Sequence, residues 1–254
     1  EGAAAADGTT NEIWVADDIY SEPGTLLLAT NMALYGGFSG TETTRSARVV
    51  ESRPELTASW LRRVVEVTGH TVTIDGFVIR DGATDTVDKE GSGIRKQTPG
   101  VLTLVNCRLL DHRQGDHTQF GTGAHFDGCT VTLSNCVVAG CSASVWSYGI
   151  GIYARNADLT VQNSLIASNY TVGWSMGGGI YVTNSLVTVT DSAFVSNQCS
   201  DFAGGAAVAI HGTGTGLFRN CRFQANHNST INDRGKTIRG GTMLVEQDAD
   251  STVR

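Results

Sequence analysis

Proline and long apolar runs are scarce in this sequence, and both absences limit the fold. Three prolines stand against 31 glycines in 254 residues. Glycine supplies turn conformations and β-branched residues suit pleated surfaces, so a chain rich in Gly, Thr and Val indicates strands and turns rather than long helices. No run of about 18 apolar residues occurs, which predicts that the chain does not span a membrane.

Positive charge is also limited. The formal net charge is -7 at pH 7, and no basic stripe of the kind found in nucleic-acid binders occurs, so we expect no nucleic-acid partner. The first residues lack the basic start and the apolar length of a signal peptide. Because residue 1 is Glu rather than Met, we expect a processed product or a piece of a longer chain.

A repeat with a period of about 28 residues follows the irregular first third of the chain. The segments VLTLVNCRLL (101–110), TVTLSNCVVA (130–139) and DLTVQNSLIA (158–167) share an apolar-x-apolar-x-Asn pattern. The polar residue that ends this pattern is called the anchor here, and successive anchors are 29, 28, 28 and 29 residues apart. The anchors are Asn106, Asn135, Asn163, Asp191 and Asn220.

Apolar residues two and four positions before each anchor share one face of a strand, because side chains alternate along strands. A further apolar column stands three positions after it, and Gly-rich segments such as GGGIYV (177–182) begin another strand. The pattern predicts an all-β, right-handed parallel β-helix with three strands per coil and about 28 residues per coil. We expect one domain over residues 1–254, with irregular coils in 1–70 and regular coils in 71–254.

The six cysteines contain no CxxC pair, which argues against a zinc site. Cys107, Cys136 and Cys221 directly follow anchors, so we expect inert buried thiols, with a disulfide as the alternative. Six positions after the anchors stands a second polar column, whose amides should bond from coil to coil. Its members are His112, Cys141, Asn169, Asn197 and Asn226.

The segments EIWVADDIYSEPG (12–24), LYGGFSGTETTRSARVV (34–50) and TIDGFVIRDG (73–82) precede the repeated coils. Together they resemble bacterial secreted or surface right-handed parallel β-helix proteins with pectate-lyase-like or polymorphic-outer-membrane-protein-type repeats. The resemblance implies an extracellular or bacterial cell-surface location. The resemblance does not identify an active site, because a fold alone does not fix function.

Charged residues that could serve a polysaccharide lyase gather in the second coil and its neighbours. A base and a charge stabiliser must meet at one sugar carbon in such an enzyme. The candidates are Lys89, Arg95, Arg113 and His117. The alternative is that these are solvated loop charges. No cofactor is expected; calcium at Asp116 or Asp127 is a weaker hypothesis, because no loop offers ligands at fixed offsets.

Two further sets of residues could bind a ligand. Aromatic residues in successive variable loops suit sugars, or else cover the side of the core; they are Trp146, Tyr148, Tyr170 and Trp174. A column of threonines three positions before the anchors could recognise a repetitive ligand such as a glycan or ice, or reflect strand propensity alone. It comprises Thr73, Thr103, Thr132, Thr160 and Thr188.

These observations favour a non-catalytic structural or adhesive module outside the cell. The alternatives are a carbohydrate-active β-helix enzyme of the polysaccharide-lyase type and a glycan- or ice-binding module. The expected partner is a polysaccharide or a cell-surface glycan. The C-terminal edge, which ends in mid-coil, is expected to contact further coils or another subunit.

Overall fold

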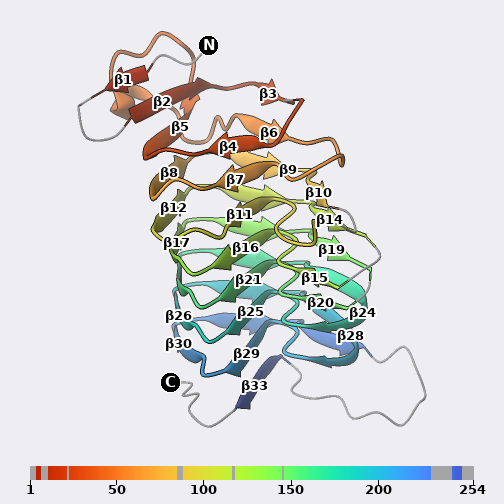
Figure 1. Ribbon diagram of the computed structural model, residues 1–254. Helices are drawn as coiled ribbons and strands as arrows, with labels where there is room; N and C mark the ends of the chain where they lie inside the picture. Colours follow the sequence, from red (N-terminus) through yellow and green to blue (C-terminus); the bar gives the residue numbers. More distant parts are fainter. Residues whose placement is uncertain are drawn as a thin grey trace.

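The computed structural model describes residues 4–6, 11–21, 23–84, 88–115, 118–144, 146–229 and 242–247. They form the predicted right-handed parallel β-helix, with about 29 residues per coil (Figure 1). Within these ranges the only helical element is the short 3-10 helix η1 at Arg45–Ala47. The predicted fold class is therefore confirmed.

Sheet A carries the anchor strands. Neighbouring strands are parallel, except that β1 is antiparallel to β2. In spatial order the strands are β1 (Ala4–Ala6), β2 (Asn11–Ala16), β5 (Met32–Phe38), β8 (Thr71–Asp75), β12 (Val101–Val105), β17 (Thr130–Ser134), β22 (Asp158–Gln162), β26 (Leu186–Thr190) and β30 (Thr215–Arg219).

Sheets B and C complete each coil. Sheet B contains β3 (Ile19–Tyr20), β6 (Glu55–Thr57), β9 (Val78–Arg80), β13 (Arg108–Leu110), β18 (Val137–Ala139), β23 (Leu165–Ala167), β27 (Ala193–Val195) and β31 (Arg222–Gln224). Sheet C contains β4 (Leu26–Leu28), β7 (Val65–Val67), β11 (Ile94–Lys96), β16 (Ala124–Asp127), β21 (Ile152–Arg155), β25 (Ile180–Thr183), β29 (Val208–Gly212) and β33 (Met243–Gln247).

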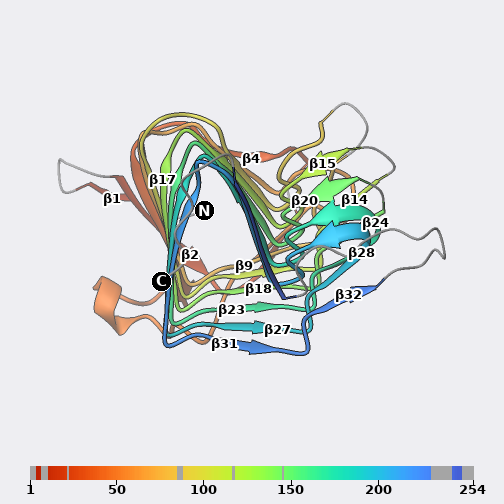
Figure 2. The same ribbon diagram turned by 90° about the horizontal axis from the view of Figure 1, so that it is seen from below.

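A fourth sheet, D, adds to the three that the repeat predicts. It is built from the segments between sheets B and C, and it lies on the side of the coil away from sheet A (Figure 2). Its strands are β10 (Ala83–Thr84), β14 (Arg113–Gln114), β15 (Gln119–Phe120), β19 (Ser142–Ala143), β20 (Ser147–Tyr148), β24 (Tyr170–Met176), β28 (Gln198–Gly204) and β32 (His227–Ser229).

The anchors form one column at the corner between sheets A and B. Each adopts a left-handed backbone conformation, with φ from 49° to 54°. Asn and Asp tolerate that conformation better than other non-glycine residues. Asn135 donates from Nδ2 to Oδ1 of Asn106 at 2.6 Å, and Asn220 donates likewise to Asp191 at 2.5 Å. The anchors therefore turn the chain and also link neighbouring coils.

The second polar column forms the predicted amide ladder at the far end of sheet B. Asn169 donates from Nδ2 to Oδ1 of Asn197 at 3.0 Å, and Asn197 donates to Oδ1 of Asn226 at 2.9 Å. Asn197 also donates to the carbonyl of Ile166 at 2.9 Å. Because Asn169 and Asn197 are fully buried, these bonds satisfy amides that would otherwise be costly to enclose.

The cysteines lie mainly inside the coil, and all six carry free thiols. Cys107 and Cys136 are buried in adjacent coils, whereas Cys221 is partly exposed. Burial raises the pKa of Cys141 and of Cys199 to about 12, which suppresses the reactive thiolate.

We therefore expect that an aromatic disulfide reagent at pH 8 modifies only Cys221 in the native protein, and all six thiols after denaturation. Absorbance of the released thiol measures the count. Four or fewer thiols in the unreduced, denatured protein would contradict the free-thiol assignment and show that cysteines had paired.

Candidate functional site

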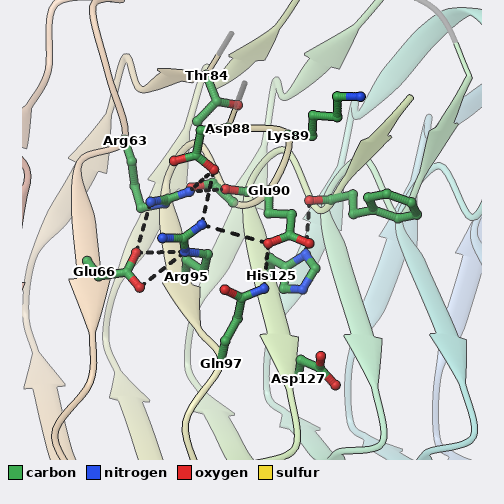
Figure 3. A network of polar contacts seen from close by, with 12 residues as sticks. Arg63, Glu66, Thr84, Asp88, Lys89, Glu90, Arg95, Gln97, His125 and Asp127 are labelled. Atoms are coloured by element: carbon green, nitrogen blue, oxygen red, sulfur yellow. Dashed lines mark hydrogen bonds and ion pairs between the residues drawn. The ribbon is translucent and has the colours of Figure 1, made fainter. Parts of the chain in front are cut away.

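Ion pairs join the loop before β11 to the outer face of sheet C (Figure 3). Arg63, only 5% exposed, contacts Glu66 at 2.9 Å and Asp88 at 2.6 Å. Arg95 contacts Glu66 at 2.8 Å, Asp88 at 3.1 Å and Glu90 at 3.7 Å. Within this cluster, called the ion-pair network, the positive charge of Arg95 is balanced by carboxylates of the protein itself.

The three candidate catalytic residues that the structure describes do not converge on one point. Arg95 belongs to the ion-pair network on sheet C, and Figure 3 shows the ammonium of Lys89 pointing away from that network. Arg113 lies on β14 in sheet D, with its guanidinium carbon 4.0 Å from the centre of the Trp60 ring. His117 lies outside the described residues.

A second, smaller core covers the outer face of sheet C. His125, Tyr153 and Tyr181 form a column there, and the two tyrosine rings stack 5.4 Å apart at an angle of 4°. Phe120 and Tyr148 of sheet D contact this column and stack on one another at 5.6 Å. We call this cluster the inner aromatic layer. Tyr148, one of the candidate ligand-binding aromatics, is half-buried and packs against Tyr181, as in the alternative in which these residues cover the side of the core.

Burial in the inner aromatic layer changes the titration of its members. It lowers the pKa of His125 to about 4 and raises that of Tyr153 to about 12. Both side chains are therefore neutral near pH 7. With 1% of its surface exposed, His125 is enclosed rather than presented to a substrate.

The other three candidate aromatics lie on the outside of sheet D. Tyr170, Val172 and Trp174 alternate along β24 and are 45%, 56% and 37% exposed. Trp146, 47% exposed, stacks on Trp174 with ring centres 4.7 Å apart and an angle of 17°. These four residues are called the outer aromatic patch. A contiguous exposed apolar patch of this kind is characteristic of an interaction surface.

The predicted threonine column is in register on sheet A and is half-buried. Its hydroxyls recur at the spacing of neighbouring strands, about 4.8 Å. The column ends opposite Ala33 on one side and Leu217 on the other. Asp158 and Arg219 interrupt the flanking columns with charge, so the regular surface is one residue wide.

The calcium hypothesis receives no support from side-chain geometry. No group of three or more His, Cys, Asp or Glu residues is placed to hold a metal within the described part of the chain. Asp127 is ion-paired with Arg155 and accepts a hydrogen bond from Asn156. Burial would raise the pKa of Asp127, but Arg155 outweighs that effect and lowers it. Asp116 lies outside the described residues.

A pocket of about 290 Å³ opens where the turn before β7 meets the start of sheet D. Its lining includes Trp60, Arg62, Arg63, Thr84 and Asp88, and it is called the Trp60 pocket. The repeat pattern did not single out this site, because the turn belongs to the irregular N-terminal coils. The sequence signal for it would have been Trp60 two positions before the pair Arg62 and Arg63.

Comparison with known protein families identifies the same fold class as the geometry. Residues 63–243 match the family described as right-handed β-helix region, and the chain belongs to that family. No curated protein matches, and no solved structure matches. Among the described residues, no helix is long and apolar enough to cross a bilayer.

Proposed function

We propose that this chain is a non-catalytic module of an extracellular or bacterial surface protein, and that it acts in adhesion by binding a polysaccharide or a cell-surface glycan. The outer aromatic patch is the observation that carries the proposal. Aromatic side chains contribute large contact areas, and Trp and Tyr also suit amphipathic ligands such as sugars.

The β-helix supports this patch on both sides of β24. Asn169 of the amide ladder directly precedes Tyr170 and fixes the start of the strand. Ser200 of the next coil donates to the carbonyls of Thr171 and Gly173, at 2.9 and 3.3 Å. A surface held in place before binding loses less conformational entropy on contact with a ligand, which favours affinity.

The ion-pair network supports a structural role for one charged candidate, Arg95. Three carboxylates already neutralise Arg95, and His125 is enclosed and neutral near pH 7. Proton abstraction from a sugar requires a base within hydrogen-bond reach of the substrate. Among the charged candidates, Arg95 is therefore already engaged by carboxylates of the protein, which supports the non-catalytic proposal.

Retention on immobilised polysaccharides and cell-wall glycans tests the proposal. We expect Trp174→Ala to weaken retention at least tenfold, because it removes an exposed ring and the stacking partner of Trp146. Leu186→Ala is the matched control, since it shortens a side chain that is 46% exposed on sheet A. That variant should stay within twofold of the unchanged protein.

Equal retention of both variants, or no retention of any, would contradict the proposal. Release of new reducing ends or unsaturated sugars is measured in the same samples. Cleavage that is lost in His117→Ala would support the enzyme alternative instead.

A further inference from the structure

Two cysteines occupy equivalent positions in adjacent coils. Cys107 directly precedes β13 and Cys136 directly precedes β18, and these strands pair in register, Arg108 with Val137. In-register neighbours on parallel strands lie about 4.8 Å apart. The Cα atoms of the two cysteines therefore fall within the range that a disulfide spans, about 4.4–6.8 Å.

The two sulfur atoms have the same surroundings, one coil apart. Sγ of Cys107 lies 3.3 Å from the carbonyl oxygen of Ile74, in the preceding coil. Sγ of Cys136 lies 3.4 Å from the carbonyl oxygen of Leu104, in the coil that holds Cys107. The Cys136 thiol is thus directed toward the coil of its neighbour. A disulfide between them requires a new side-chain rotamer at Cys107 rather than a shift of the backbone.

No other two cysteines of the described chain are related in this way. The residues opposite Cys129 in the adjacent coils are Gly100 and Ala157. The remaining cysteines likewise have no cysteine at the equivalent position of a neighbouring coil; they are Cys141, Cys199 and Cys221. Oxidation within one chain therefore has a single favoured pair.

An open groove gives a small oxidant a route to one of these two thiols. The groove has a volume of about 540 Å³ and follows the anchors Asn135, Asn163 and Asp191 along the corner between sheets A and B. Cys136, 1% exposed, is among the residues that line it, whereas Cys107 is fully buried and is not. A peroxide molecule in the groove therefore meets Cys136 first.

The surroundings also favour a thiolate at Cys136 over one at Cys107. The thiol and the N–H of Cys107 hydrogen-bond to Cys136; together they outweigh burial and lower the pKa of Cys136. Burial raises the pKa of Cys107 well above its ordinary value. The thiolate is the form that attacks a peroxide, so Cys136 is the more reactive of the two.

From this arrangement we propose that Cys136 and Cys107 form a redox pair, which hydrogen peroxide converts into a disulfide between adjacent coils. The Cys136 thiol attacks one peroxide oxygen and the O–O bond breaks, which yields a sulfenic acid and one water. The Cys107 thiol then attacks the Cys136 sulfur. The S–O bond breaks, the S–S bond forms, and a second water leaves with the thiol proton.

The balance is two thiols oxidised by two electrons and one peroxide reduced to two waters. This modification site goes beyond the proposed function, which requires no cysteine. Its outcome is a covalent link between coils that hydrogen bonds alone join in the reduced protein.

Exposure of the reduced, native full chain to hydrogen peroxide tests the pair. The chain carries Cys221→Ser, because Cys221 is partly exposed and would react by itself. We expect peroxide to remove two of the five thiols that remain, counted after denaturation. Tandem mass spectrometry should find the peptides of Cys107 and Cys136 linked, and a thiol reductant should restore both thiols.

Serine is a suitable replacement in this column. Ser164 and Ser192 directly follow the next two anchors and are buried, and Oγ of Ser164 donates to the Gln162 carbonyl at 2.7 Å. Added to the same chain, Cys107→Ser should prevent the disulfide and leave Cys136 as a sulfenic acid, which a 1,3-diketone probe labels.

Cys199→Ser is the matched control, because it removes another buried thiol and should still lose two thiols to peroxide. Five thiols in the exposed Cys221→Ser protein, a disulfide between any other cysteines, or loss of two thiols in the chain with Cys107→Ser would overturn the proposal. The linked peptides come from the protein that keeps both cysteines, so the test stands even if the Cys107→Ser variant does not fold.

Discussion

Between pH 6.5 and pH 4 the protein is expected to lose several kcal/mol of unfolding free energy, because two buried histidines resist protonation. His112 is fully buried, and burial lowers its pKa from 6.5 to about 3. Its Nδ1 accepts from the Gly82 N–H at 3.0 Å, while its Nε2 is enclosed without a partner in the described structure. Burial likewise lowers the pKa of His125 to about 4.

The direction of this change in unfolding free energy with pH follows from proton linkage. Between the folded and unfolded pKa values, the unfolded chain binds more protons than the folded one. The stabilisation is therefore complete above about pH 6.5 and is lost as the pH falls toward 4 for His125 and toward 3 for His112. Each histidine contributes a slope of up to about 1.4 kcal/mol per pH unit.

Urea unfolding at several pH values between 7.5 and 5, compared with His112→Asn, measures this effect. Asn169, at the equivalent position two coils further on, accepts from the Cys141 N–H and donates to the Val138 carbonyl, both in the coil before it. Asn at position 112 can use the equivalent groups, the Gly82 N–H and the Ile79 carbonyl, without a titrating side chain. Near pH 5 the variant should be more stable than the unchanged protein. Its unfolding free energy should change with pH about half as steeply. Parallel curves for the two proteins would show that His112 does not titrate as its burial predicts.

The coil was predictable because its inner face repeats strictly. Leu104 and Leu133 stand two residues before their anchors, and they pair in register and are fully buried. A shift of one residue would turn both side chains to the outside, so the apolar pattern fixes the register. The left-handed corner at each anchor adds a second local signal, since Asn tolerates it.

Sheet D and the inner aromatic layer carried no comparable signal. β14 and β19 have two residues each, too few to show alternation. Tyr153 follows Ile152 on β21, and both are buried, one inside the coil and the other under sheet D. A strand covered on both faces reads as a continuous apolar run, which hides its second contact surface.

The candidate sites differ in the same way, because only residues at repeated spacings could be placed from the sequence. The 28-residue spacing of Trp146 and Trp174 predicted neighbours in adjacent coils, and the two rings stack. Tyr148, two residues after Trp146, is half-buried against the inner aromatic layer, and Trp146 itself has a φ of 25°. The ion-pair network could not be predicted from the sequence, because Arg63 and Asp88 come from segments with no repeated spacing.

Replacement of Asn197 by Leu is expected to destabilise the protein by at least about 3 kcal/mol, although the two side chains are similar in size. The amide of Asn197 donates to the Ile166 carbonyl and to Oδ1 of Asn226, and its oxygen accepts from both nitrogens of Asn169. Leu would leave several of these buried groups without partners, at about 1–3 kcal/mol each.

Thr160→Val is the control, because it removes a hydroxyl from the half-buried outer face of β22 and should change stability by less than about 0.5 kcal/mol. Urea unfolding at pH 7.5 measures both variants, with the slope of the transition checked for a common unfolded state. An Asn197→Leu protein as stable as Thr160→Val would mean that the apolar columns alone hold adjacent coils together. A large loss confined to Asn197→Leu would mean that the buried amide ladder also holds adjacent coils together.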